Sequence, residues 1–275
     1  MSIPVVVSLA AVAGAVIEAV ILYFLLDMLK EAGSVGENYQ GRDIPVSAGI
    51  SFPIAVIGVF LLYAWFSWYD QSYHLFILGL VAISFLGFID DMLGKRDTLG
   101  FKGHFGALFK GKLTTGGLKA LGGGLIAFYL VIFSSTGIVN IVIDTLIIAL
   151  FTNNLNLLDL RPGRAIKGYL FFLVAILVMA GGKIDWLLIT PLIGAVGYYF
   201  IIDLKANAMM GDAGSNVLGL SLGYLSIISL SLAFRVGIMV FLVLMHFYTE
   251  KYSLTETIEK VSLLKALDQL GRSSE

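Results

Sequence analysis

Nine long apolar segments, separated by short polar stretches, dominate the pattern of this chain. A helix needs about 20 mostly apolar residues to cross the hydrocarbon core of a membrane. Backbone N–H and C=O groups in lipid must pair within the chain, so helices are the expected form of these segments. We therefore predict an all-α integral membrane protein, a polytopic bundle of about nine transmembrane helices, over residues 3–28, 46–67, 73–89, 115–133, 138–152, 168–181, 186–202, 217–232 and 236–248.

The composition favours a membrane protein and excludes an ordinary soluble domain. Hydrophobic residues make up 58% of the chain, charged residues 13%, and the mean hydropathy is +0.92. No polar stretch is long enough to fold alone, so residues 1–252 are expected to form one membrane domain, without cysteines for disulfide or thiol chemistry. In the tail, residues 253–275, apolar positions at helical spacing predict an amphipathic helix over Ser253–Leu270, lying on the membrane.

The basic residues predict the orientation of the bundle. If nine segments alternate in direction, one side of the membrane holds 16 of the 18 Lys and Arg residues, and the other side keeps only Lys183 and Arg235. Basic loops stay in the cytoplasm. We therefore expect a multi-pass plasma-membrane protein with its N-terminus outside and its C-terminus in the cytoplasm. In the longest cytoplasmic loop we expect an interfacial helix near Phe105–Phe109, with His104 placed to meet an anionic substrate.

Three polar clusters follow apolar segments and open on this same cytoplasmic side: Asp90-Asp91, residues 153–159, and residues 211–215. Acids near lipid are costly and usually mark function, and carboxylates are ligands that Mg²⁺ prefers. Each cluster also has a structural reading. The aspartate pair could simply reach for water at a helix end, the asparagines could cap a helix C-terminus, and Asp212 or Ser215 could cap the next helix.

Basic and acidic residues outside these clusters carry weaker signals. Arg161, Arg164 and Lys167 follow the second cluster at spacings of three. They could screen the charge of a diphosphate, or they could only reflect the preference of basic residues for cytoplasmic loops. Glu18 lies in the middle of the first segment, where a charge is expensive, and has no assigned catalytic role. Asp144 lies toward the opposite side of the membrane from the three clusters.

Taken in order, these motifs resemble the polyprenyl-phosphate N-acetylhexosamine-1-phosphate transferases, over residues 30–220. The stretch Arg42-Asp43-Ile44-Pro45-Val46-Ser47-Ala48-Gly49 is similar to the family's basic loop after the first span, and Asp90-Asp91 is similar to its aspartate pair. Lys119 is similar to the family's loop lysine, with Lys110 and Lys112 as alternatives. Asn153, Asn156 and Asp159 fit the Asn-x-x-Asn-x-x-Asp motif, and Gly211-Asp212-Ala213-Gly214-Ser215 fits Gly-Asp-x-Gly-Ser.

The resemblance implies an enzyme that moves a phospho-sugar from a UDP-sugar to undecaprenyl phosphate, releases UMP and needs Mg²⁺, with Mn²⁺ as an alternative. It implies that Asp212, with Asp91, binds the metal, that Asp90 deprotonates or orients the lipid phosphate, and that Lys119 assists. It places the sugar nucleotide near a set of substrate-binding residues: Asn153, Asn156, Asp159, Arg161, Arg164 and Arg42. Membrane lipids are expected partners, nucleic acid is not, and a homodimer is compatible with the resemblance.

Two departures from the family keep other functions open. The second motif continues Asp159-Leu160-Arg161-Pro162-Gly163, without the family's second aspartate, and no histidine-rich loop follows the ninth segment. One alternative is a non-catalytic, lipid-phosphate-binding or regulatory relative. Another is an ion-coupled transporter that would use acids near the midplane, such as Glu18, although most acids cluster at one face.

Overall fold

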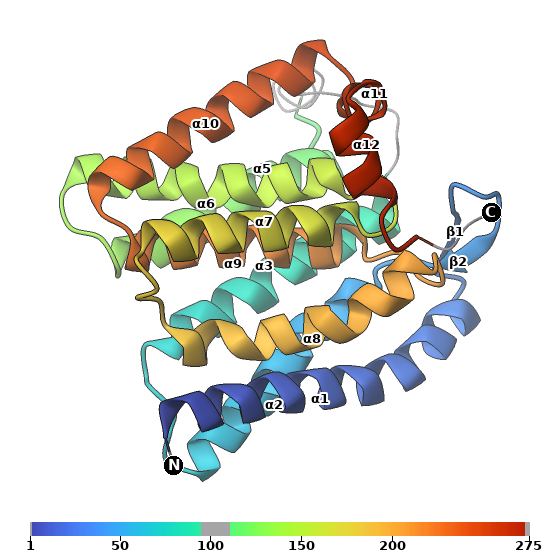
Figure 1. Cartoon of the computed structure of the whole chain (residues 1–275). Helices are drawn as coiled ribbons and strands as arrows, with labels where there is room; N and C mark the ends of the chain where they lie inside the picture. The colour runs from blue at the N-terminus through green and yellow to red at the C-terminus, as the bar shows by residue number, and fades with distance from the viewer. Residues whose placement is uncertain (1, 95–110, 273–275) are drawn as a thin grey trace.

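The computed structural model describes residues 2–94 and 111–272 and is built almost entirely of helices (Figure 1). The predicted interfacial helix near Phe105–Phe109 and the predicted role of His104 fall outside the described residues. A small antiparallel hairpin, β1 with β2, follows the first helix. In chain order the elements are α1 (Ile3–Glu31), β1 (Val35–Glu37), β2 (Asp43–Pro45), the 3₁₀ turn η1 (Ala48–Ile50), α2 (Ser51–Trp65), α3 (Tyr73–Leu93), α5 (Thr115–Ile132), α6 (Ile138–Leu158), α7 (Arg164–Met179), α8 (Trp186–Leu204), α9 (Gly211–Ser229), α10 (Leu232–Lys251), α11 (Leu254–Lys260) and α12 (Ser262–Gln269).

Within the described ranges, seven helices are long and apolar enough to cross a membrane: α1, α2 with η1, α3, α5, α6, α8 and α10. Nine were predicted, and the structure does place a helix at each predicted segment. Two of these helices fall short. α7 has 16 residues and is therefore about 24 Å long, less than the roughly 30 Å of the hydrocarbon core. α9 is long enough but carries too many Ser, Gly and Asn residues.

The polar composition of α9 has a structural reason. The helix is enclosed by its neighbours, and every residue from Ala213 to Ile227 is buried, so none of them has to face lipid. α9 lies along α6 and α3, in the middle of the bundle (Figure 1). Two glycines permit the close approach to α6. A Cβ at Gly219 would lie 2.7 Å from the Phe151 carbonyl carbon, and a Cβ at Gly223 would lie 2.6 Å from the Ile148 Cα.

A second close pair is formed by α1 and α8, at the edge of the bundle (Figure 1). A Cβ at Gly194 would lie 2.8 Å from the Ala11 carbonyl carbon, so this crossing also needs a glycine. Glu18 of α1 is fully buried here and is hydrogen-bonded to the Ser51 hydroxyl at the start of α2. The Glu18 side chain therefore faces protein and not lipid.

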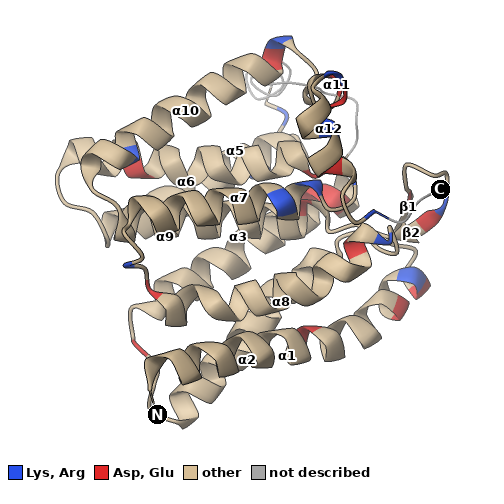
Figure 2. Ribbon diagram, viewed as in Figure 1, with Lys and Arg blue, Asp and Glu red and all other residues tan. Residues whose placement is uncertain are grey.

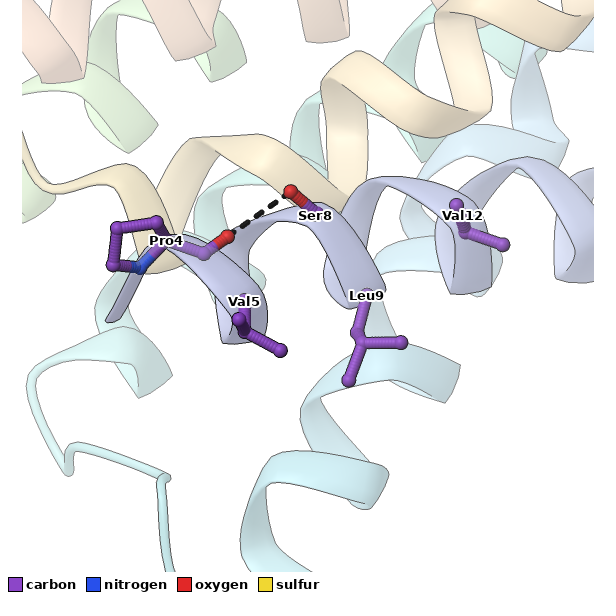
Figure 3. Close-up of a pocket in the computed structure, with 5 residues that line it drawn as sticks. All are labelled: Pro4, Val5, Ser8, Leu9 and Val12. Atoms are coloured by element: carbon purple, nitrogen blue, oxygen red, sulfur yellow. Dashed lines mark hydrogen bonds between the residues drawn. The ribbon is translucent and has the colours of Figure 1, made fainter. Parts of the chain in front are cut away.

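Charged residues gather at one end of the bundle, where the hairpin, the α8–α9 loop and the C-terminal helices lie (Figure 2). Towards the other end, Asp144 of α6 is fully buried and pairs with Arg235 of α10. Most of the remaining outer surface is apolar, as expected of helices that face lipid. Near the start of α1 the apolar surface forms a shallow groove of about 300 Å³, lined by Pro4, Val5, Ser8, Leu9 and Val12 (Figure 3).

The tail forms two short helices in place of the single amphipathic helix predicted over Ser253–Leu270. The break falls at Val261, whose backbone is extended. The predicted amphipathic character is present in α12, where Leu263, Leu264 and Leu267 are exposed on the outside. Both helices lie across the charged end of the bundle (Figures 1 and 2).

Candidate functional site

The three polar clusters of the sequence meet at the charged end of the bundle. Asp90 and Asp91 come from the last turns of α3, Asn156 from the last turn of α6, and Asp212 from the first turn of α9. Lys119, from the first turns of α5, joins them. Four helices that are far apart in the sequence therefore place one cation, three carboxylates and an amide in direct contact.

Lys119 bridges two of the carboxylates. Its Nζ lies 2.9 Å from Asp90 Oδ2 and also pairs with Asp212 Oδ2. The lysine is thus the one that the resemblance favoured, while Lys112, its alternative, is exposed, and Lys110 lies outside the described residues. All three side chains of the bridge stay partly accessible, between 18% and 23% exposed, so a ligand can reach them.

Asp91 holds the start of α9 in place. Its carboxylate accepts hydrogen bonds from the backbone N–H groups of Asp212, at 3.0 Å, and Ala213, at 3.2 Å, and from the Ser47 hydroxyl. Neither Asp212 nor Ser215 caps α9, and Met210 at the N-cap position makes no side-chain cap bond. The cap comes from another helix. Asp212 therefore keeps its carboxylate free for Lys119 and Asn156.

Two glycines allow α3 to approach this turn. A Cβ at Gly87 of α3 would lie 2.6 Å from the Ala213 nitrogen, so a larger residue would push α3 away from α9. Gly211 has a φ of +71°, and a Cβ there would meet the Asp91 carboxylate and, at 3.0 Å, the Ser47 Cα. The glycine of the Gly-Asp-x-Gly-Ser motif is thus required by backbone conformation and by the closeness of Asp91.

The asparagine motif on α6 contributes Asn156 directly. Its side-chain amide donates to Asp212 Oδ1 and lies 3.3 Å from the Ser215 hydroxyl. Asn153, one turn earlier, is half-buried, and the intervening Asn154 is buried. Asn156 therefore orients the Asp212 carboxylate from the side opposite Lys119, and Asn153 remains accessible on the same stripe of α6.

The pKa of Asp159, the C-cap residue of α6, is shifted mainly by burial. Burial, followed by the charges of Asp203, Asp212 and Asp91, raises the pKa of Asp159 well above its usual range, although a hydrogen bond from the Gly211 N–H opposes the shift. Lys119 is the cation that contacts the cluster directly. Among the described residues there is no ready-made group of three or more His, Cys, Asp or Glu side chains arranged to hold a metal.

The predicted arginines lie around the cluster and not in it. Arg42 is exposed in the turn of the hairpin, where it donates to Gln40. Arg161 lies over the ring of Tyr39, 5.5 Å from its centroid, which joins the α6–α7 loop to the same hairpin. Arg164 is only 5% exposed and is paired with Asp268 of the tail. None of these three arginines makes a described contact with Asp90, Asp91 or Asp212.

Two residues of the site were not predicted from the sequence. Ser47 carries the hydroxyl that binds Asp91, and it adopts a left-handed backbone with a φ of 64°. Its turn is held by the Ala48 N–H to Met209 C=O bond of 3.0 Å. Asp203, buried near the end of α8, accepts the Gly163 N–H at 2.9 Å, and its charge helps to raise the pKa of Asp159. Ser47 lay inside a quoted motif, while Asp203 showed only as an acid at the end of an apolar segment.

Comparison with known proteins does not assign the chain to a family. No family model matches it. None of the curated proteins matches it significantly.

Proposed function

We propose that this protein transfers a phospho-sugar from a UDP-sugar to a polyprenyl phosphate, such as undecaprenyl phosphate, at the cytoplasmic face of the plasma membrane, releasing UMP. The observation that supports it is the convergence of Asp90, Asp91 and Asp212 on Lys119 and Asn156, at one end of a bundle of apolar helices. The distribution of basic residues places the N-terminus outside and the C-terminus in the cytoplasm. In this orientation, the charged end of the bundle lies in the cytoplasm. The substrates of such a reaction are a membrane lipid and a soluble nucleotide, which meet only at the membrane surface.

A divalent cation such as Mg²⁺ fits this site by its chemistry. The carboxylates of Asp90, Asp91 and Asp212 converge there with the one ammonium group of Lys119, so negative charge exceeds positive charge among these contacting groups. Asp212 and Asp91 are the residues that would hold the ion, since both Asp212 oxygens and Asp91 Oδ1 each accept one described hydrogen bond and keep a second lone pair. When bound, the ion would neutralise charge on the diphosphate of the sugar nucleotide.

The residues of the chain then have distinct tasks. An oxygen of the lipid phosphate attacks the phosphorus that carries the sugar, the bond from that phosphorus to the bridging oxygen breaks, and UMP leaves with the electron pair. The lipid phosphate is already an anionic nucleophile, so positioning and charge neutralisation are the main requirements. Lys119 screens the two phosphates from each other, and Asp90 orients Lys119. Asn156 and Asn153 line the approach for the nucleotide.

The test is an assay of UMP release by purified protein with undecaprenyl phosphate, Mg²⁺ and a panel of UDP-sugars. Wild-type protein should release UMP with at least one donor, and the Asp212→Asn variant should lose about 10²- to 10³-fold in rate. Asp27→Asn is the matched control, because Asp27 is an exposed acid on α1 whose contact is a surface pair with Lys30. An Asp212→Asn variant that is as active as the control would remove the proposal.

A second candidate function is supported by the Lys119 bridge. The ammonium already pairs with Asp90 and Asp212, which suits a protein that binds a lipid phosphate through Lys119 without catalysing transfer. The UMP assay, together with a measurement of undecaprenyl phosphate binding, separates the two candidates. Saturable binding of undecaprenyl phosphate that depends on Lys119, with no UMP released from any donor, would favour the non-catalytic role.

A further inference from the structure

The C-terminal tail is joined to the bundle through Arg164, the first residue of α7. The Arg164 guanidinium donates to both carboxylate oxygens of Asp268, at 2.8 and 3.1 Å, and to the Thr255 hydroxyl at 2.9 Å. Lys167, one turn further along α7, donates to the Asp268 carbonyl oxygen at 2.8 Å. Such a two-pronged guanidinium–carboxylate pair is the geometry by which arginine also binds phosphate.

The charges around this contact are mostly positive. Arg272 of the tail adds a third cation, 2.7 Å from Asp268 Oδ1, and also donates to the Pro162 carbonyl at 2.8 Å. Burial disfavours the charged Asp268, but its bonds with Arg164 and Arg272 outweigh burial and lower the pKa of Asp268. Asp268 is therefore a bound anion. It is supplied by the chain itself, next to the loop that leads from Asp159 to α7.

The attachment of α12 depends on these polar contacts. No residue of α12 is buried, and Leu263, Leu264 and Leu267 are all exposed. A helix that contributes no side chain to the core can be released by replacing its charged contacts alone. A phosphate carries more charge than a carboxylate and has more acceptor oxygens, so it can compete for the same guanidinium.

We propose that Arg164 and Lys167 form an anion-binding site for a phosphate-bearing molecule, and that Asp268 occupies this site in the present structure as an internal competitor. Binding of the anion displaces Asp268 and releases α12. The dipole of α7 supports the site, because its positive end lies at Arg164 and favours an anion there. The proposal does not require the transfer reaction, since the site lies on α7 and the carboxylate cluster on α3, α6 and α9.

The chain has no cysteines, so pairs of spin labels can be placed freely. Val178→Cys on α7 and Leu263→Cys on α12 put the labels at positions 73% and 70% exposed. The distance between them is measured with and without inorganic pyrophosphate, at constant ionic strength set with sodium chloride. We expect one narrow distance without pyrophosphate and a longer, broader distribution with it. Asp268→Asn should give the broad distribution without any pyrophosphate.

Two further variants make the result specific. Glu256→Gln removes one negative charge from the tail, like Asp268→Asn, but Glu256 pairs with Lys260 on the exposed side, so the narrow distance should remain. Calorimetry should show that Asp268→Asn binds pyrophosphate more tightly, by about tenfold if nine molecules in ten are closed, and that Arg164→Gln loses the binding. An unchanged distance at saturating pyrophosphate, or equal affinity in the wild type and Asp268→Asn, would overturn the proposal. Neither measurement involves turnover, so a failed transfer assay leaves this test intact.

Discussion

The contact between Gly49 of η1 and Gly214 of α9 offers a sharp test of the site geometry. A Cβ at Gly214 would lie 2.7 Å from the Gly49 Cα and 3.1 Å from the Met210 sulfur, where 3.4 Å is an ordinary contact. The backbone of η1 must therefore move by about 0.7 Å to admit one methyl group. Because Ser47, which binds Asp91, immediately precedes η1, the movement reaches the carboxylates of the candidate site.

The Gly214→Ala substitution has two opposing effects on stability. Alanine favours a helix over glycine by about 1 kcal/mol, whereas overpacking costs about 1–3 kcal/mol. The net expectation is a loss of up to about 2 kcal/mol in the free energy of unfolding, together with a fall in UMP release of up to about 10²-fold if the carboxylates shift by about 1 Å. Gly197→Ala is the control, because Gly197 is helical, exposed and has no heavy atom within 4 Å of its added Cβ.

The assay compares the unfolding of both variants in detergent, and their UMP release, with those of the wild type. Gly197→Ala should be neutral or more stable, by up to about 1 kcal/mol, and fully active. The reasoning is refuted if the two variants change stability in the same direction, or if Gly214→Ala keeps full activity. Either result would mean that η1 and α9 are not in contact as the structure places them.

Three further predictions concern charged groups. Lys119→Met should lower UMP release by about 10²-fold or more, because two carboxylates lose their cation, while Lys205→Met, an exposed lysine, should leave the rate unchanged; equal rates would contradict the bridge. Glu18→Gln should unfold like the wild type, since its Ser51 contact needs only a neutral polar group, whereas Glu18→Ala should lose about 2 kcal/mol or more; equal losses would contradict the hydrogen bond. Because the pKa of Asp159 is raised in the fold, its contribution to stability is fully present below the ordinary carboxyl range and is lost as the pH rises through the pKa of the folded state. Asp159→Asn should therefore flatten the fall in the free energy of unfolding with rising pH, measured from unfolding curves at a series of pH values. An unchanged pH dependence would contradict the raised pKa.

The long apolar helices could be predicted from the sequence because lipid imposes a simple rule on them. Hydropathy identified the seven described helices that are long and apolar enough to cross a membrane, and it located α7 and α9 as well. It overestimated the number of spans because a run of mixed Leu, Gly and Ser residues reads the same whether it faces lipid or protein. What distinguishes α9 is that its neighbours, above all α3 and α6, enclose it, and a count along the chain does not contain that information.

The acids of the site were also visible in the sequence, because a carboxylate beside an apolar segment is expensive and therefore conspicuous. Their partners were less visible. Ser47 looks like an ordinary turn residue until its left-handed backbone and its bond to Asp91 are seen. Arg164 looked like a phosphate ligand from its spacing alone, yet it pairs with a residue 104 positions away. The hairpin strands have three residues each, too few for an alternating pattern.

The composition of α9 links the fold to the site. A conventional transmembrane helix of Leu, Ile and Val would keep its neighbours roughly 8–10 Å away, axis to axis. Gly214, Gly219 and Gly223 instead let η1 and α6 touch the α9 backbone along its length. The closeness to α6 lets Asn156 reach Asp212. Gly211, with Gly87 of α3, lets Asp91 reach the N–H groups that begin α9. Glycines that make α9 a poor membrane span therefore also bring polar side chains from separate helices together at its first turn.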